Sequence, residues 1–447
     1  MDDFAEIIPL FGEGDNENSL VVHKNISEII TKGKSYQGNA SVVIDLLPYP
    51  SLHIYGRYID IPQIEMLDIH CHHDFIRELS VNGKKVEGIK KTSRVDMERN
   101  ICDITWVPSN QPIIGLGSDE TKIKRITFHL FDFKEFSGTE SSFEGDETRK
   151  QRFEHILFDS EDIKMQLKSL VETNDNIKKM NSEGICLLTH VGTIEKTDGE
   201  AFTGKQASEY LTELASFFSF ARGKRCNPVF AVGFDDSHTR VWESWSSPTS
   251  QHGDSFPSWF DPSHGEQLVS FFKGFHRKWK DDTWRDTLRE AIYWYLNSNI
   301  PSKGIDIGII LTQTAIERLS FQFSVEHKKL LTAETFKSLR AADKFRILFA
   351  SLGLPLDISD HTPKLKAKAK KFQWENSPHA LTEIRNSIVH PEHKRRGQFD
   401  DLIDEVWNLG LWYLEISILV LCDYKGTYAN RMEMKKRFVG QVENFTW

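Results

Sequence analysis

The residue types best suited to chemistry lie in one short segment near the C-terminus, Leu381–Pro391, which contains Arg385, Asn386 and His390. On a helix, Asn386 and His390 are four residues apart and share a face, and Pro391 places His390 toward the end of that helix. An imidazole titrates near neutral pH, and the planar guanidinium of Arg matches the oxygens of a phosphate. The three side chains therefore predict a phosphodiester site that works without a metal.

Basic residues surround this segment. Between residues 361 and 397 the sequence has nine Lys or Arg against three Glu, in a chain whose formal net charge is −9. Phosphate binding is the natural use of such a local excess, and Phe372 and Trp374 are candidates for stacking on bases. The predicted RNA-binding residues are Lys364, Lys366, Lys368, Lys370, Lys371, Lys394, Arg395 and Arg396. A solvated helix face or a surface loop has the same composition.

The segment also has a purely structural interpretation, because its pattern fixes only three residue types. Arg385 could pair with Glu383 or bond a carbonyl oxygen, and His390 could be a surface residue at a helix end.

These residues resemble a known family. Arg385-Asn386-x-x-x-His390 matches the Arg-x(4–6)-His signature of HEPN domains, in the form with a polar residue after the Arg, and the resemblance covers roughly residues 280–425. The helical segment around Glu317 is similar to an earlier HEPN helix that often carries a Glu. The front of the chain is similar to the large domains that precede HEPN domains in anti-phage proteins of the ApeA type.

The resemblance implies a metal-independent endoribonuclease in bacterial anti-phage defence by abortive infection, without a cofactor. His390 would act as general base or acid on the 2′-hydroxyl and the leaving oxygen, Arg385 would bind the scissile phosphate, and Asn386 would orient one of them. The products would carry 2′,3′-cyclic phosphate and 5′-hydroxyl ends. Two HEPN domains pair to form the site, so RNA and a second copy of the chain are the expected partners, and Glu317 would be auxiliary. The alternative is a HEPN-like bundle that dimerises, or binds RNA or nucleotide, without cutting.

Two other clusters contain residue types that can bind metals or act in catalysis, but their positions favour structural roles. His70–Asp74 contains His, Cys and Asp, but on a strand at most three of them share a face, so a solvated strand face is expected and no metal site. Asp261, His264 and Glu266 lie in a Ser/Pro/Gly-rich stretch, where a loop and cap role is expected. The sequence has no Walker A loop, no HExxH and no GxSxG.

The elements that position the motif follow from periodicity. Short runs of β-branched and aromatic residues predict strands through about residue 250, with Asn82-Gly83 as a hairpin turn and Val229–Trp245 as a second hairpin. Thr203 and Gln206 predict a capping box that opens one helix in this region. This part is expected to recognise a trigger and restrain the nuclease; as a rival it could itself be the functional centre, a carbohydrate or protein recognition domain.

Beyond the Ser/Pro/Gly-rich residues 246–265 the apolar period changes to three or four, which predicts helices. One of them is expected to begin with Ser377 as N-cap and Pro378 at its first position. The predicted fold is therefore α+β, with a β-rich domain over residues 1–262 and an all-α bundle of four to five helices over residues 263–447, which the resemblance implies is a HEPN bundle.

Composition sets the remaining limits. The chain has 447 residues, 39% of them hydrophobic and 27% charged, which is typical of a globular protein of two or three domains. The longest apolar run, Leu409–Cys422, is interrupted by Glu415 and is too short for a membrane span, so it predicts a buried helix. Five scattered cysteines and an acidic N-terminus predict a cytoplasmic protein with reduced thiols and no membrane association.

Overall fold

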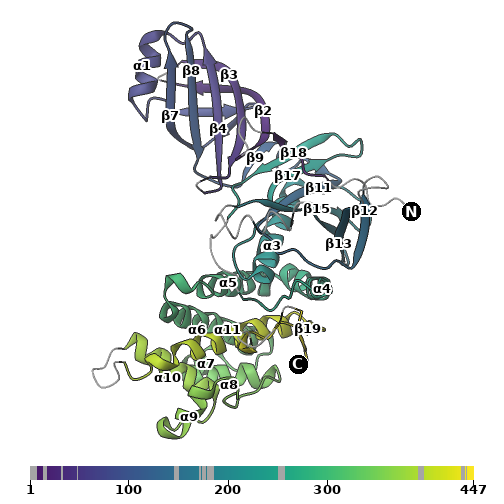
Figure 1. The fold of residues 1–447 in the computed structure, drawn as a ribbon, viewed down its shortest axis with the longest axis vertical. Coiled ribbons are helices and arrows are strands. Elements are labelled where there is room, and N and C mark those ends of the chain that lie inside the picture. The colour runs from purple at the N-terminus through teal and green to yellow at the C-terminus, as the bar shows by residue number, and fades with distance from the viewer. Residues whose placement is uncertain are drawn as a thin grey trace. The chain divides into compact units, whose positions relative to one another are not determined.

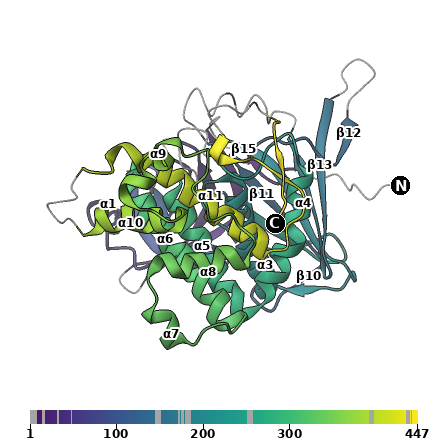
Figure 2. The same cartoon turned by 90° about the horizontal axis from the view of Figure 1, so that it is seen from below.

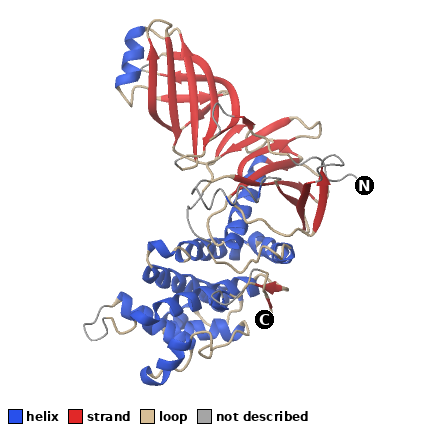
Figure 3. Ribbon diagram, viewed as in Figure 1, coloured by secondary structure: helices blue, strands red, loops and turns tan. Residues whose placement is uncertain are grey.

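The computed structural model describes all residues except 1–7, 14–17, 32–33, 48, 145–150, 171–172, 174–177, 179–185, 250–256, 391–396, 434–437 and 439. Strands dominate residues 19–245, and helices dominate residues 266–421 (Figure 3). The predicted order, a β-rich part followed by a helical part, is confirmed.

The chain forms two compact units. The first contains residues 1–135, 140–214 and 226–253, and the second contains residues 136–139, 215–225 and 254–447. The second unit therefore takes two short internal segments of the β-rich part, residues 136–139 and 215–225, as well as the helical end of the chain.

The first sheet of the β-rich unit, here called sheet A, is antiparallel and curled (Figure 1). Its order is β6-β5-β2-β3-β4-β8-β7, with β1 paired to β2. Asn82 and Gly83 both have positive φ, 52° and 71°, and join β5 to β6, so the predicted hairpin turn is confirmed. The bounds are β1 Gly12–Glu13, β2 Ser19–Ile30, β3 Ser35–Asp45, β4 Ser51–Ile59, β5 Glu78–Val81, β6 Lys84–Val86, β7 Gly88–Asp96 and β8 Ile101–Pro108.

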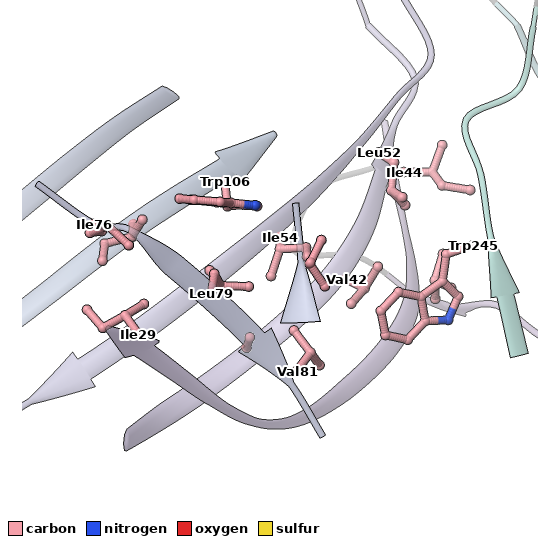
Figure 4. Close-up of a cluster of buried hydrophobic side chains, with 14 of the residues drawn as sticks. Ile29, Val42, Ile44, Leu52, Ile54, Ile76, Leu79, Val81, Trp106 and Trp245 are labelled. Atoms are coloured by element: carbon pink, nitrogen blue, oxygen red, sulfur yellow. The ribbon is translucent and has the colours of Figure 1, made fainter. Parts of the chain in front are cut away.

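One face of sheet A is the core of this unit. Alternate residues of each strand point inward, as the period of two requires, and Val42, Ile54 and Trp106 are 0%, 0% and 3% exposed. Trp245 from the second sheet joins the same cluster (Figure 4). The opposite face of β2, β3, β4, β8 and β7 carries mainly polar residues, with Ile26 and Tyr55 exposed among them.

The second sheet, sheet B, is also antiparallel, in the order β12-β13-β14-β15-β11-β17-β18-β9. The predicted hairpin over Val229–Trp245 is confirmed as β17 and β18. The bounds are β9 Ile113–Leu116, β11 Arg125–Phe131, β12 Glu140–Glu144, β13 Gln151–Asp159, β14 Ile163–Ser169, β15 Leu188–Lys196, β17 Val229–Phe234 and β18 Arg240–Trp245, and a small separate ladder pairs β10 Lys122–Ile123 with β16 Phe202–Thr203.

Helix α3, Gly204–Arg222, begins at the predicted capping box. The backbone N–H of Gln206 donates to Oγ1 of Thr203 (3.2 Å), and the backbone N–H of Thr203 donates to Oε1 of Gln206 (2.9 Å). Its C-terminal half counts with the second unit, where Phe217 stacks on Phe271 at 5.8 Å between ring centroids. The helical unit therefore contains the C-terminal half of α3 in addition to the residues after the predicted boundary at 263, and α3 supplies part of its aromatic core.

The second unit is built of helices (Figures 1 and 2). Their bounds are α4 Glu266–Lys280, α5 Asp282–Ser298, α6 Ile305–Phe321, the π-helical turn η2 Gln322–His327, α7 Ala333–Ser338, α8 Ala341–Ser351, α9 Pro363–Phe372, α10 Ser377–Val389 and α11 Ile403–Leu421, with short 3-10 turns at Pro301–Lys303, Asp400–Leu402 and Arg431–Glu433 and a two-stranded ladder, β19 Thr427–Tyr428 and β20 Glu443–Asn444. Helix α6 contacts α5, α8, α10 and α11, so it is central to the packing. None of the described helices combines the length and apolarity that a membrane span needs.

A buried ion pair lies in the middle of this unit. Arg431 donates from Nη2 to Oε1 of Glu415 (2.7 Å) and from Nε to Oε2 (3.0 Å), and both side chains are at most 2% exposed. Tyr295 of α5 donates its hydroxyl to the same carboxylate at 2.5 Å, and Arg431 also donates to Oδ1 of Asn299 at 3.0 Å. Glu415, which interrupts the apolar run of α11, is therefore the counter-ion of Arg431, which follows that helix in the chain.

Removing one partner of this pair should be strongly destabilising. Glu415→Leu leaves the Arg431 guanidinium buried without its carboxylate, so we expect the free energy of unfolding to fall by about 3–5 kcal/mol. Urea titration of the full chain, followed by far-UV circular dichroism, measures this change.

Two control variants are compared with Glu415→Leu. Glu415→Leu/Arg431→Met removes both charges and should recover most of the loss. Arg277→Ala removes an exposed pair with Asp423, with side chains 56% and 64% exposed, and should cost less than about 1 kcal/mol. A loss for Glu415→Leu no larger than that of Arg277→Ala would contradict the assignment.

Candidate functional site

The Arg385-Asn386-x-x-x-His390 motif occupies the last turn of α10 and the residue after it. The helix begins one residue earlier than predicted, because the N-cap is Asn376, whose Oδ1 accepts the backbone N–H of His379 at 3.0 Å. Ser377 is therefore the first helical residue and not the N-cap, and its hydroxyl donates to the carbonyl of Asp357 at 2.9 Å. Near the other end, the backbone N–H of His390 donates to the carbonyl of Asn386 at 2.8 Å, which closes the last turn.

The three predicted site residues lie together at this helix end and reach solvent. Asn386 and His390 are exposed, and Arg385 is half-buried. Arg385 donates from Nη1 to Oδ1 of Asn386 at 3.2 Å. Within the part of the chain that the structure describes, no carboxylate lies at ion-pair distance from Arg385.

Glu383, the predicted alternative partner of Arg385, has other contacts. Its Oε2 accepts from Nε1 of Trp374 at 2.7 Å and lies 3.9 Å from Nε2 of His379. The Arg385–Glu383 pair of the alternative interpretation is therefore not among the described contacts, although the two residues are only two apart in sequence. On a helix, such residues point in different directions.

Helix α9 carries the predicted lysine run, and its N-terminus is fixed by α11. The carboxylate of Glu405 accepts the backbone N–H groups of Lys364 and Leu365 at 3.1 and 2.9 Å, a role that a local N-cap side chain usually has. Sequence reasoning missed Glu405, although the acidic stretch around it, Asp400–Glu405, is a charge complement to the lysines.

The five lysines of α9 differ in what they contact. Lys368 binds both carboxylate oxygens of Asp401, at 2.6 and 2.7 Å, and this bond lowers the pKa of Asp401. Lys366 pairs with Asp360, and Lys364 donates to the carbonyl of Asp401 at 3.1 Å. Lys370 and Lys371 have no carboxylate at ion-pair distance among the described residues, so they are the members of the run most available to phosphate.

Other predicted residues take different places. Trp374 is only 6% exposed and stacks on Phe372 at 5.0 Å between centroids, so the expectation that Trp374 stacks on bases is wrong; the ring is a packing element. Glu317 on α6 pairs with Nζ of Lys344 on α8 at 2.5 Å, and no described contact joins it to Arg385 or His390. Lys394, Arg395 and Arg396 lie outside the described residues.

The strand predicted for His70–Asp74 is wrong, because Gln63–Cys71 forms helix α1. Met66 and Ile69, three residues apart, are both fully buried, as a helix face requires. The ammonium of Lys90 donates to the carbonyls of Ile69, His70 and His72 and so satisfies the C-terminal end of α1. Among the described residues, no group of three or more His, Cys, Asp or Glu is arranged to hold a metal.

The Asp261–Glu266 segment has the loop role that was expected, but not the cap role, because the N-cap of α4 is Gly265 and no side chain of the described residues caps that helix. Asp261 is fully buried, and its carboxylate accepts the backbone N–H groups of Ser263 and Gly440 at 2.9 and 3.2 Å. His264 contacts Oε1 of Glu266 at 3.0 Å and the carbonyl of Gly440 at 3.1 Å. These contacts attach a C-terminal loop to the start of α4.

Parts of both units are similar to known protein families. Residues 281–443 match the family model of the YopA C-terminal domain, and residues 118–255 match that of the YopA central domain. The chain is also similar to the SPbeta prophage-derived uncharacterized protein YopA of Bacillus subtilis (strain 168), with 27% identity over 328 residues, which is 71% of this chain and 71% of that protein. No solved structure matches. The matched C-terminal region includes the whole Arg385–His390 turn.

Proposed function

We propose that the helical unit is a HEPN-type bundle that cleaves RNA without a metal at the end of α10. The observation that carries the proposal is the exposed turn with Arg385, Asn386 and His390, whose guanidinium has no carboxylate partner among the described residues. A site for a phosphodiester needs a cation that is not already neutralised and an imidazole that water can reach.

The three side chains divide the reaction between them. The neutral imidazole of His390 takes the proton of the 2′-hydroxyl as the 2′-oxygen attacks the phosphorus, or its protonated form gives a proton to the departing 5′-oxygen. Arg385 neutralises the charge that develops on the non-bridging oxygens, and Asn386 holds the guanidinium through its Oδ1. The P–O5′ bond breaks as the P–O2′ bond forms, which leaves 2′,3′-cyclic phosphate and 5′-hydroxyl ends.

One chain supplies one imidazole, and general acid and general base act on opposite sides of the phosphorus. We therefore propose a homodimer in which two α10 ends face one RNA. Val389, beside His390, is 37% exposed, an apolar side chain suited to such a contact. In this proposal the protein acts in the cytoplasm in anti-phage defence by abortive infection, and the β-rich unit senses a trigger and restrains cleavage. The prophage origin of the similar B. subtilis protein adds a phage context.

The second candidate is a bundle that dimerises, or holds RNA or nucleotide, without cutting. Lys370 and Lys371 favour it as much as they favour a nuclease, because unpaired lysines bind phosphate whether or not cleavage follows. Cleavage and binding must therefore be measured separately.

Arg385→Ala/His390→Ala should abolish cleavage. Full-length wild-type protein is incubated with total cellular RNA in EDTA, and 2′,3′-cyclic phosphate ends are counted. Loss of a positioned proton donor or acceptor typically lowers a rate about 10²–10⁴-fold, so the double variant should lose at least 10²-fold.

Arg289→Ala/His361→Ala is the matched control, because it removes the same residue types from exposed positions of the same unit. Cleavage by the Arg385/His390 variant at the wild-type rate would overturn the site. A restrained nuclease would also bind RNA without cutting it, so the assay is repeated with extract of phage-infected cells as a source of the trigger. RNA binding without cleavage by any of the three proteins under both conditions would favour the second candidate.

The lysines of α9 can be tested in matched pairs. Lys370→Gln/Lys371→Gln should weaken binding of a single-stranded RNA and lower the slope of log affinity against log salt by about 1.4, from two contacts of about 0.7 each. Lys366→Gln/Lys368→Gln removes the same charge from lysines that are paired with carboxylates, so the slope should change less. Fluorescence anisotropy between 50 and 300 mM salt measures both, and equal slopes for the two variants would contradict the difference.

A further inference from the structure

The solvent face of sheet A contains a hollow of about 920 Å³ on the side opposite the core. It extends over β2, β3, β4, β8 and β7, which lie side by side in the sheet (Figure 1). At about 4.8 Å between neighbouring strands, the five strands span about 19 Å. The hollow lies before residue 118, where the first family match begins. It is independent of the nuclease proposal.

The first of two rows of side chains in this hollow carries hydroxyl groups and one aromatic ring. Strand register places Lys24 opposite Ser41, Ser41 opposite Tyr55, Tyr55 opposite Thr105, and Thr105 opposite Thr92. Tyr55 lies on the central strand of the five and is 40% exposed. The hydroxyl of Thr92 donates to that of Thr105 at 3.0 Å.

The second row lies two residues along each strand. It places Ile26 opposite Asn39, Asn39 opposite Arg57, Arg57 opposite Asp103, and Asp103 opposite Arg94. Arg57 and Asp103 form a planar two-bond pair, from Nε to Oδ1 at 2.7 Å and from Nη2 to Oδ2 at 3.1 Å. Such a pair holds donors and acceptors in one fixed plane before any ligand arrives.

Positive charge in the hollow lies at its two edges. Lys24 on β2 and Arg94 on β7 have no carboxylate at ion-pair distance among the described residues, whereas Arg57 is neutralised by Asp103. With Lys24, Arg57 and Arg94 against Asp103, the lining has a surplus of two positive charges. The surface therefore favours a ligand that carries some negative charge.

The distribution of hydrogen-bond acceptors in the hollow favours one of two anionic ligands, a nucleic acid or an acidic saccharide. Asp103 in the middle of the second row is neutralised by Arg57, so the centre of the face offers no net positive charge to the regularly spaced phosphates of a nucleic acid that crosses the strands. A sugar hydroxyl is both donor and acceptor, so it matches a surface in which Asn39, Thr105 and the Arg57–Asp103 pair offer both kinds of group. An exposed Tyr ring supplies a platform for the C–H face of a sugar.

We propose that the solvent face of sheet A binds an acidic oligosaccharide that crosses the strands. Its rings pack over Tyr55, its hydroxyls bond the Arg57–Asp103 pair, and its carboxylate or phosphate groups bind Arg94 and Lys24. The β-rich unit is then a saccharide-recognition module whatever the helical unit does.

The test uses a printed array of oligosaccharides that carry uronic-acid, sialic-acid or phosphate groups, together with their uncharged counterparts and an eight-nucleotide single-stranded RNA. Full-length wild-type protein should bind acidic members and bind the uncharged ones at least 10-fold more weakly. Arg94→Ala should weaken binding to the acidic members about 10-fold, because hydrogen bonds to charged groups are among the strong ones.

Arg99→Ala is the matched control, since Arg99 is exposed on the β7–β8 turn outside both rows. It should change binding less than twofold, and the thermal midpoints of both variants should equal that of wild type, because both side chains are exposed. Tyr55→Ala should weaken binding to acidic and uncharged saccharides alike.

Three results would overturn the proposal. They are no acidic saccharide bound above background, equal binding by wild type and Arg94→Ala, and binding of the RNA alone with the same dependence on Arg94. The last result would assign the face to nucleic acid.

Discussion

The ion pair between Arg431 and Glu415 is the interaction on which the helical unit depends. Both charges are buried, so each would be costly alone, and the pair is tolerable only because the geometry supplies several hydrogen bonds at once. Tyr295 and Asn299 add bonds from α5 and its C-terminus, and the carbonyl of Pro257 accepts from Nη2 of Arg431 at 3.1 Å. One guanidinium thus joins α5, α11, the segment before α4 and the segment after α11.

The candidate site is connected to this centre through packed helices. Helix α11 carries Glu415 in its middle and Glu405 near its start, and Glu405 fixes the N-terminus of α9. Helix α10 is attached to central helix α6 by Gln313, whose Nε2 donates to the buried carbonyl of Leu381 at 2.6 Å. Arg385 lies one turn beyond Leu381. The beginning of α10 is therefore anchored in the core while its last turn reaches solvent, which a site for a macromolecular substrate requires.

Local signals were enough where a few neighbouring residues decide the structure. Thr203 and Gln206 bond each other's backbone across one turn, and Asn82-Gly83 adopts the two positive φ values of its turn without outside help. The motif on α10 has the same character, so its position at an exposed helix end could be predicted. Prediction failed where distant residues decide. Lys90, 20 residues away in sequence, stabilises the end of α1, and no local pattern shows it. Trp374 is buried because Phe372 and Phe399 close over it.

The hollow on sheet A is a proposed binding surface that local sequence patterns likewise do not predict. Its residues come from five strands between positions 24 and 105, and along any single strand they read as ordinary polar residues on an exposed face. Register brings Arg57, Asp103 and Arg94 into one row, and a shift of one residue in any strand would turn the side chains of that strand toward the core. The apolar residues that fix the register, such as Ile54 and Trp106, therefore also determine which polar groups meet on the other face. A binding surface of this kind is encoded by the core beneath it, and it becomes visible only when the strand pairing is known.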